Sequence, residues 1–279
     1  MASPSPPSRA AGPSDDPSDD PSDHALAARL ATEAGALLVE LRGRAGATEA
    51  SAASLRADGD RRAHRFVVDA LAEHRPDDAV LSEEATDDDG GGAGEALARR
   101  QRAERVWIVD PLDGTREFAE PPRTDWAVHV ALVVRGWPVA GAVALPAQGV
   151  TLATHPAPPP PPPHGGPPRL IVSRSRPPAV ALALAEALGG ELVTMGSAGA
   201  KAMAVVRGQA DIYAHAGGQY EWDSCAPVAV AAAAGLHVSR LDGSALAYNR
   251  PDPWLPDLLI CRPELAPTVF DALSALDRA

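Results

Sequence analysis

Long apolar runs and cysteines are scarce in this sequence. No run of about 18 uncharged apolar residues occurs, so we expect no transmembrane helix. The N-terminal residues lack the basic-then-apolar order of a secretory signal peptide. Two cysteines among 279 residues do not make a disulfide framework. Together these absences predict a protein of the reducing cytoplasm.

Positive charge is also in short supply. The chain carries 25 Lys and Arg against 37 Asp and Glu, a formal net charge of −12 at pH 7, which argues against nonspecific binding to nucleic acid. Lys201 is the only lysine, which suggests a role that a guanidinium cannot fill. An acidic protein that acts on an anionic phosphate needs metal ions to screen its own carboxylates.

The residues best suited to chemistry follow one short apolar run. Val106 to Val109 is rich in β-branched and aromatic residues and predicts a strand buried on both faces. Two carboxylates, Asp110 and Asp113, stand at its C-terminal end, three positions apart. Carboxylate oxygens at a strand end are ligands that Mg²⁺ prefers.

The residues after these carboxylates predict a turn into a helix. Gly114 lets the backbone turn closely, and Thr115 is a natural N-cap for a helix that begins near Arg116. The free N–H groups of such a helix end favour an anion. The whole stretch therefore indicates a metal ion that bridges to a phosphate.

The hexapeptide DPLDGT, residues 110–115, resembles the signature of the Mg²⁺-dependent, lithium-sensitive phosphatase superfamily, which includes inositol monophosphatases and fructose bisphosphatases. Its continuation REF, residues 116–118, is more similar to the 3′(2′),5′-bisphosphate nucleotidase branch of the CysQ type. The similarity extends from about residue 25 to the C-terminus. It implies a mixed α/β (α+β) fold, the layered α-β-α-β-α sandwich of the inositol monophosphatase and sugar phosphatase type, with the site between two halves.

The resemblance also implies metal ligands from three distant segments. Glu83, Asp110 and the Leu112 carbonyl would hold one Mg²⁺ ion, and Asp110, Asp113 and Asp223 a second; a third ion is possible in this family. Four clustered carboxylates would repel one another without cations between them. Two ions about 3.5–4 Å apart would clamp a phosphate for in-line attack by water. Asparagine in place of Asp113 or Asp223 should abolish activity and leave the fold intact.

Three further residues receive catalytic roles from the resemblance. Asp60, 23 residues before Glu83, would orient Thr115, and Thr115 would position and deprotonate the attacking water. Glu84 would support the metal ligands or bind another ion. For Asp60 an equal alternative is an ordinary carboxylate at a helix start, favoured there by the helix dipole.

The residues placed against the substrate come from both halves. They are Asp113, Gly114, Thr115, Arg116, Ser173, Ser197, Lys201 and Asp223. For Ser197 and Lys201 the alternative is a close-packed helix of small residues with a surface lysine. His129 lies inside an expected strand without an evident partner, and we interpret it as a core histidine.

Composition divides the chain into four parts. We expect a disordered acidic tail over 1–24, a metal-binding α+β half over 25–155, a proline-rich surface linker over 156–168 and a substrate-binding α/β half over 169–279. Within the first half, leucine spacing predicts a helix over 25–42, then a mobile loop, then a second helix from about residue 60.

The resemblance implies a phosphomonoesterase that converts 3′-phosphoadenosine 5′-phosphate to AMP and phosphate, as in sulfate assimilation. The alternatives are an inositol-1-phosphate or fructose-1,6-bisphosphate phosphatase, or a non-catalytic phosphate-binding regulatory protein. The partner is then a small-molecule phosphate rather than nucleic acid or membrane, and relatives are monomers or homodimers.

Overall fold

Two five-stranded sheets organise the computed structural model, which describes residues 21–44, 49–85, 93–163 and 165–276. The predicted acidic tail falls outside the described residues up to residue 20, as does the Gly-rich stretch over 87–92. The first sheet has the order β1-β2-β3-β4-β5 and the second the order β7-β6-β8-β10-β9.

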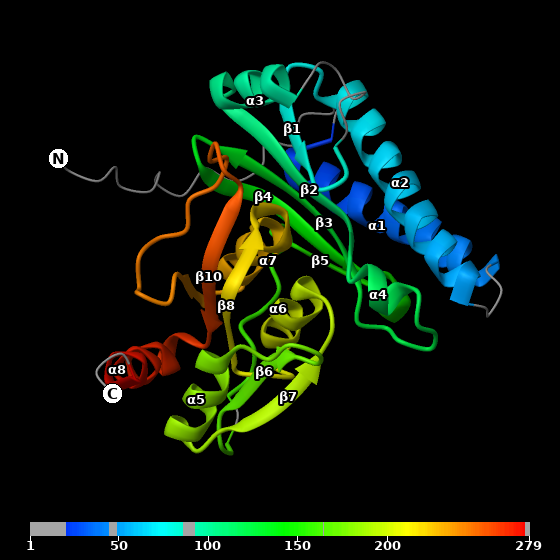
Figure 1. Ribbon diagram of the computed structural model, residues 1–279. Helices are drawn as coiled ribbons and strands as arrows, with labels where there is room; N and C mark the ends of the chain where they lie inside the picture. Colours follow the sequence, from blue (N-terminus) through cyan, green and yellow to red (C-terminus); the bar gives the residue numbers. More distant parts are fainter. Residues whose placement is uncertain (1–20, 45–48, 86–92, 164, 277–279) are drawn as a thin grey trace.

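The first half supplies the first sheet and the helices around it, with α1 and α2 on the right of the sheet in Figure 1. Its elements are α1 (Asp23–Arg44), α2 (Glu49–His74), β1 (Ala79–Ser82), α3 (Ala93–Arg102), β2 (Arg105–Asp113), α4 (Thr115–Phe118), β3 (Ala127–Val134), β4 (Trp137–Leu145) and β5 (Val150–Ala153). β1 and β2 pair in parallel, and the other neighbours pair antiparallel. The parallel pair brings the ends of β1 and β2 to the same edge.

The second half supplies the second sheet. Its elements are β6 (Arg169–Ser173), α5 (Ala179–Leu188), β7 (Glu191–Met195), α6 (Ala198–Val206), β8 (Ile212–Tyr220), α7 (Glu221–Ala233), β9 (His237–Ser239), β10 (Trp254–Cys261) and α8 (Ala266–Leu276). β6 is parallel to both β7 and β8, whereas β10 runs antiparallel to β8 and β9.

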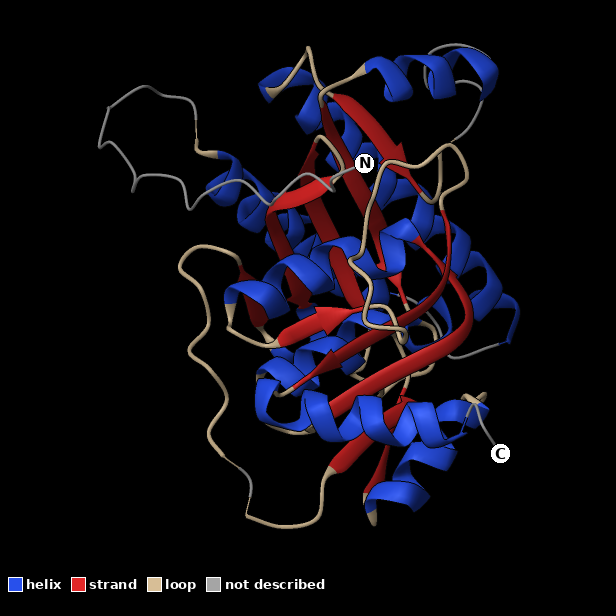
Figure 2. Ribbon diagram, turned by 90° about the vertical axis from the view of Figure 1, so that its left-hand side faces the viewer, coloured by secondary structure: helices blue, strands red, loops and turns tan. Residues whose placement is uncertain are grey.

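Three apolar clusters separate five layers. Helices α1 and α2 cover one face of the first sheet, α6 and α7 lie between the two sheets, and α5 and α8 cover the far face of the second sheet. Figure 2 shows the same succession of helices and strands from the side. The layered α-β-α-β-α prediction is therefore confirmed.

Helix α2 begins earlier than the sequence pattern suggested. The expected loop before residue 60 was wrong, because the helix already starts at Glu49. Three of the six residues from Ala52 to Ala57 are alanine, the best helix former, so intrinsic propensity compensates for the lack of a continuous apolar face in this segment. Leu55 then packs into the core below the helix. Asp60 consequently lies in the interior of α2, which excludes its interpretation as a helix-start carboxylate.

The proline-rich segment runs along the outside of the second half, as the long loop on one side of Figure 2. Arg262 holds the proline-rich segment in place, since its guanidinium donates to the carbonyls of Pro161 at 3.1 Å and Pro162 at 2.5 Å. The Nε atom of Arg262 donates to Asp211 at 2.6 Å. This segment thus has a fixed anchor on the second sheet.

None of the helices that the structure describes is both long and apolar enough to cross a membrane.

Candidate active site

Carboxylates from three segments meet where β2 ends. Asp110 and Asp113 lie in the last four residues of β2, and Asp223 is the third residue of α7. Glu83 directly follows β1, and its backbone N–H donates to the Val109 carbonyl at 3.3 Å, which extends the parallel pairing by one residue. The strand order thus explains how residues distant in sequence share one site.

These carboxylates perturb one another strongly. Desolvation and the charge of Asp223 raise the pKa of Glu83 to about 7. Desolvation and Asp113 likewise raise the pKa of Asp223 to about 6. Asp110 is 1% exposed, and its pKa is raised well above the ordinary value by desolvation and by the charges of Asp113 and Glu83. Such a cluster of hard oxygen donors fits a divalent cation, which would supply the missing positive charge.

Asp113 differs from the other three because it is held by the second half. Its carboxylate accepts from the Ser197 hydroxyl at 2.6 Å and from the backbone N–H groups of Gly199 at 2.6 Å and Ala198 at 3.2 Å. Although desolvation opposes ionisation, His129 and Ser197 lower the pKa of Asp113 to about 2. A carboxylate of the first half therefore caps the first turn of α6.

His129 has the partners that sequence analysis did not find. Its side chain is fully buried; Nδ1 donates to the Trp222 carbonyl at 3.0 Å, and Nε2 lies 3.2 Å from an oxygen of Asp113 without a well-directed hydrogen bond. Among the described residues, Asp110, Asp113 and His129 bring ligand atoms within 4.8 Å of one another. The interpretation as an ordinary core histidine is incomplete, because His129 joins two segments that carry carboxylates. Only the pairing of β2 with β3, invisible in a strand pattern, places it there.

Asp60 and Thr115 lie together beside the carboxylates. The Thr115 hydroxyl donates to the Leu112 carbonyl at 3.1 Å and is near enough to Asp60 to lower its pKa by hydrogen bonding. Desolvation and the charge of Glu84 outweigh this effect and raise the pKa of Asp60 to about 7. The structure therefore brings together all three residues to which sequence analysis gave catalytic roles.

The helix after the DPLDGT motif differs from the prediction. α4 is a single turn of four residues, and its N-cap is Gly114 in the left-handed conformation (φ 83°) rather than Thr115. A Cβ at residue 114 would also lie 2.9 Å from Cβ of Ser197, so both the backbone conformation and the lack of space require glycine here. A helix this short has little dipole to offer an anion. The longer helices α6 and α7 begin at the site instead.

Ser197 and Lys201 are both buried beside Asp113. Ser197 is the N-cap of α6, since its hydroxyl oxygen accepts from the N–H of Ala200 at 2.9 Å. Lys201 is only 5% exposed and donates to the carbonyls of Ser197, at 2.8 Å, and Gly196. Burial lowers the pKa of Lys201. Lys201 is therefore not a surface lysine. Its ammonium group lies beneath the loop that contacts Asp113.

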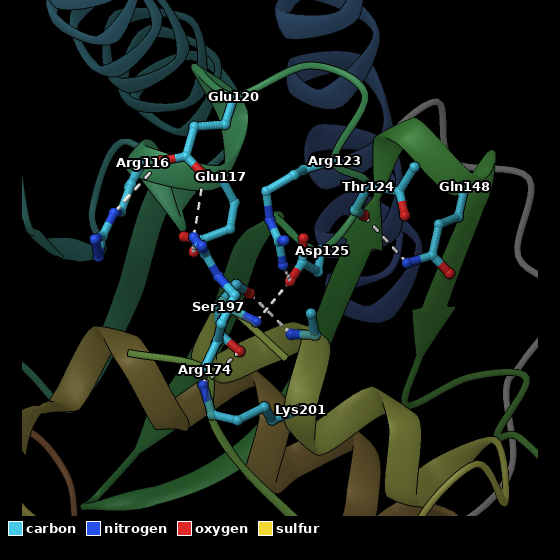
Figure 3. A network of polar contacts seen from close by, with 12 residues as sticks. Arg116, Glu117, Glu120, Arg123, Thr124, Asp125, Gln148, Arg174, Ser197 and Lys201 are labelled. Atoms are coloured by element: carbon cyan, nitrogen blue, oxygen red, sulfur yellow. Dashed lines mark hydrogen bonds and ion pairs between the residues drawn. The ribbon is translucent and has the colours of Figure 1, made fainter. Parts of the chain in front are cut away.

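Charged residues that the sequence analysis did not select bridge the two halves (Figure 3). Arg174, which follows β6, donates to Glu117 at 2.8 Å and to Glu120 at 3.1 Å. Asp125 accepts from the N–H of Gly196 at 2.6 Å. These pairs could not be found from sequence, because each joins segments at least 50 positions apart.

Two predicted substrate residues lie at the edge of this network. Arg116 is exposed and pairs with Glu120, which lies just beyond the end of α4, at 3.5 Å. Ser173 ends β6 and accepts from the N–H of Arg176 at 3.3 Å. Both remain free to turn toward a ligand, because neither is bonded to the carboxylate cluster.

Raised carboxylate pKa values predict that metal binding and pH are coupled. Because the pKa values of Asp60, Glu83 and Asp223 lie above their ordinary values, the stability that these three groups contribute to the metal-free protein is present below pH about 4 and is lost as the pH rises toward 7. Mg²⁺ should reverse this loss. We expect MgCl₂ to raise the melting temperature more at pH 7.5 than at pH 5, with NaCl of equal ionic strength as the control. An equal increase at both pH values would show that these carboxylates do not bind the ion.

The chain matches the inositol monophosphatase family over residues 21–155 and 172–274. It is 49% identical over 255 residues to the 3′-phosphoadenosine 5′-phosphate phosphatase of Mycobacterium bovis, which covers 87% of this chain and 90% of the relative. The protein of the same name from Mycobacterium leprae is 48% identical over 261 residues, with 89% and 92% covered. The 3′(2′),5′-bisphosphate nucleotidase CysQ of Escherichia coli K12 is 34% identical over 203 residues, with 69% and 79% covered.

Solved structures agree with these relatives. The crystal structure of CysQ from Bacteroides thetaiotaomicron superposes with a TM-score of 0.70 at 26% identity, over 85% of this chain and 96% of that chain. An inositol monophosphatase from Thermotoga maritima superposes with a TM-score of 0.67 at 20% identity, over 90% and 96% of the two chains. The latter likeness establishes the fold alone.

Proposed function

The chain belongs to the inositol monophosphatase family, and we propose that within it this protein hydrolyses the 3′-phosphate of 3′-phosphoadenosine 5′-phosphate to give AMP and phosphate. The observation that carries the proposal is the carboxylate cluster at the end of β2, together with mycobacterial relatives of that name at 48–49% identity. The family is metal-dependent, and the protein is an enzyme of the phosphatase class.

The carboxylate cluster would hold the metal. We assign Glu83, Asp110, Asp113, Asp223 and the Leu112 carbonyl to two or three Mg²⁺ ions. When bound, Mg²⁺ supplies positive charge that attracts the phosphate and stabilises the charge developing on its oxygens. A carboxylate has about four lone-pair positions. Since Asp113 uses three of them for Ser197, Ala198 and Gly199, one remains for a cation.

Asp60 and Thr115 would remove the proton of the attacking water. The Thr115 hydroxyl turns from the Leu112 carbonyl toward Asp60, and Oγ1 accepts a proton from water while its own proton passes to the Asp60 carboxylate. Glu84, whose charge acts on Asp60, would keep that carboxylate basic. Water then attacks phosphorus directly and the bond between phosphorus and the 3′-oxygen breaks; the 3′-oxygen takes a proton from solvent, and Asp60 returns its proton to solvent.

A covalent intermediate on cysteine has no support. Cys225 and Cys261 are fully buried free thiols, and desolvation raises the pKa of each. A buried thiol of raised pKa is a poor nucleophile. Free thiols also suit a reducing cytoplasm, which we propose as the location.

The second phosphate of the substrate would meet arginine side chains. Arg116, Arg174 and Arg176 are all exposed, and Arg174 bonds to Glu117 in the helix that also holds Arg116. Arginine recognises phosphate through paired N–H donors. Ser173 and the Gly196–Ser197 turn would line the same side, with Lys201 adding positive charge from below.

Phosphate release from three substrates tests this proposal. With Mg²⁺ present, we expect kcat/KM for 3′-phosphoadenosine 5′-phosphate to exceed that for inositol-1-phosphate and for fructose-1,6-bisphosphate at least tenfold, about 1.4 kcal/mol of transition-state discrimination. A flat or reversed profile would move the protein to the sugar-phosphate branch. Phosphate binding without release from any substrate would instead indicate a regulatory protein.

A further inference from the structure

His129 is a polar side chain in an otherwise apolar row of the first sheet. Alternate residues of a strand face the same side, and the neighbours of His129 on its face of β3, Ala127 and Ala131, pack in the core cluster that holds α6 and α7. In the pairing of β3 with β2, His129 lies directly opposite Asp110. Its imidazole is fully buried. The two small neighbours leave room for the ring, and the contacts of its two nitrogen atoms indicate what it does there.

One ring nitrogen holds the start of α7. Nδ1 donates to the Trp222 carbonyl at 3.0 Å. Trp222 is the second residue of α7, and its carbonyl belongs to the planar peptide that joins it to Asp223. The hydrogen bond therefore fixes the backbone from which the Asp223 side chain projects.

The other ring nitrogen lies against Asp113. Nε2 is 3.2 Å from Oδ2 of Asp113, a close electrostatic contact rather than a well-directed hydrogen bond. The same oxygen accepts from the Ser197 hydroxyl and from the N–H of Gly199, each at 2.6 Å. Residue 199 has to be a glycine, because a Cβ there would clash with Nε2. His129 and α6 thus enclose Oδ2 between them.

The second oxygen of Asp113 is left for a cation. Among the described residues, Oδ1 accepts a hydrogen bond only from the N–H of Ala198, at 3.2 Å. A carboxylate oxygen has about two lone-pair positions, so Oδ1 keeps one and Oδ2 keeps none. The contacts of Oδ2 therefore decide in which direction Oδ1 points.

We propose that His129 is a positioning residue, which orients the Asp113 carboxylate relative to the start of α7 and so holds Asp113 and Asp223 in the arrangement that a divalent cation needs. This inference rests on the proposed function, in which both aspartates are metal ligands. The two come from different halves of the chain, and His129 contacts the first directly and the second through the preceding peptide. In this role His129 itself contacts neither the ion nor the substrate.

His129→Leu tests the role, because it removes both contacts and keeps an apolar side chain beside Gly199. Since residues that hold metal ligands change metal affinity or activity by about 10–100-fold when mutated, we expect Mn²⁺ to bind this variant at least about tenfold more weakly. Mn²⁺ takes the same oxygen ligands as Mg²⁺, and electron paramagnetic resonance of the free ion measures its binding without substrate. The Mg²⁺ concentration at half-maximal rate should rise by a similar factor, while KM for 3′-phosphoadenosine 5′-phosphate at saturating Mg²⁺ should not change.

Leu132→Ala separates positioning from stability. Leu132 lies in the same strand as His129 but faces α1 and α2. The cavity left by this substitution should lower the melting temperature, and Mn²⁺ should bind as tightly as to the original protein. A loss of Mn²⁺ affinity equal to that of His129→Leu would show that any weakening of the core loosens the site, and would overturn the proposal.

His129→Asn separates the two contacts of the ring. An asparagine amide can place its nitrogen near the position of Nδ1 and donate to the Trp222 carbonyl, but it is too short to reach Asp113. We expect Mn²⁺ to bind this variant more tightly than His129→Leu and less tightly than the original protein. The original affinity in either variant would refute the role, so the test stands even if the leucine variant does not fold.

The proposed function and this role of His129 fail separately. If the original protein releases phosphate at the same rate after divalent cations are removed, the proposed metal ligands are wrong. If it needs the cation but His129→Leu binds Mn²⁺ as tightly as before, the function stands and His129 has no positioning role.

Discussion

Asparagine in place of Asp223 is expected to lower kcat/KM at least a hundredfold while the protein remains folded. Even residues that only support metal ligands change affinity or activity by about 10–100-fold when mutated, so loss of a ligand should cost more. The fold is spared because Asp223 makes a single hydrogen bond of its own, from the N–H of Tyr220, and the asparagine carbonyl can accept the same bond. Initial rates at saturating Mg²⁺ and a thermal melt measure both effects.

The matched control for Asp223→Asn is Asp69→Asn, an exposed residue of α2 away from the site. This variant removes the same charge and should leave both rate and stability unchanged. If Asp223→Asn keeps more than about a tenth of the original rate, well outside the 10–100-fold range of supporting residues, Asp223 is not a metal ligand.

Asparagine in place of Asp113 should instead damage activity and stability together. The earlier expectation of an intact fold was made for both aspartates, but Asp113 accepts three hydrogen bonds at the start of α6. An asparagine amide would turn a donor toward the backbone N–H groups of Ala198 or Gly199. We expect a loss of about 2 kcal/mol or more in the free energy of unfolding, measured with urea at pH 7.

The pH dependence of this loss identifies its cause. The folded-state pKa of Asp113 is about 2, below its ordinary value of 3.8. The stabilisation is therefore fully present above pH about 4 and disappears as the pH falls toward 2. The difference between the original protein and Asp113→Asn should shrink between pH 5 and pH 3. A difference that stays constant would point to packing rather than to the charge of Asp113.

Sequence reasoning located the active site well because its signals are local. The strand predicted over Val106 to Val109 lies within β2, and the DPLDGT motif stands at the end of that strand as predicted. Apolar runs bounded by polar residues define such strands without knowledge of their neighbours. The metal-ligand assignments remain predictions, although the structure gathers all five residues in one place.

The parts that sequence reasoning missed depend on tertiary contacts. The extra turns of α2 follow from alanine propensity, which an apolar pattern does not register. The partners of His129 follow from the register between β2 and β3. Arg174 meets Glu117 only because the two halves face each other. None of these contacts can be identified from the amino-acid sequence of a single chain.

The contact between His129 and helix α6 constrains how this sequence can evolve. A Cβ on Gly199 would lie 2.0 Å from Nε2 of His129, so no side chain fits at residue 199 while the imidazole is in place. Conversely, a small residue at 129 would leave a void that an alanine at 199 could fill. The two positions form a reciprocal pair, and in divergent lineages they are bound to covary. A histidine in one strand has thereby fixed a glycine 70 positions away in another layer of the protein.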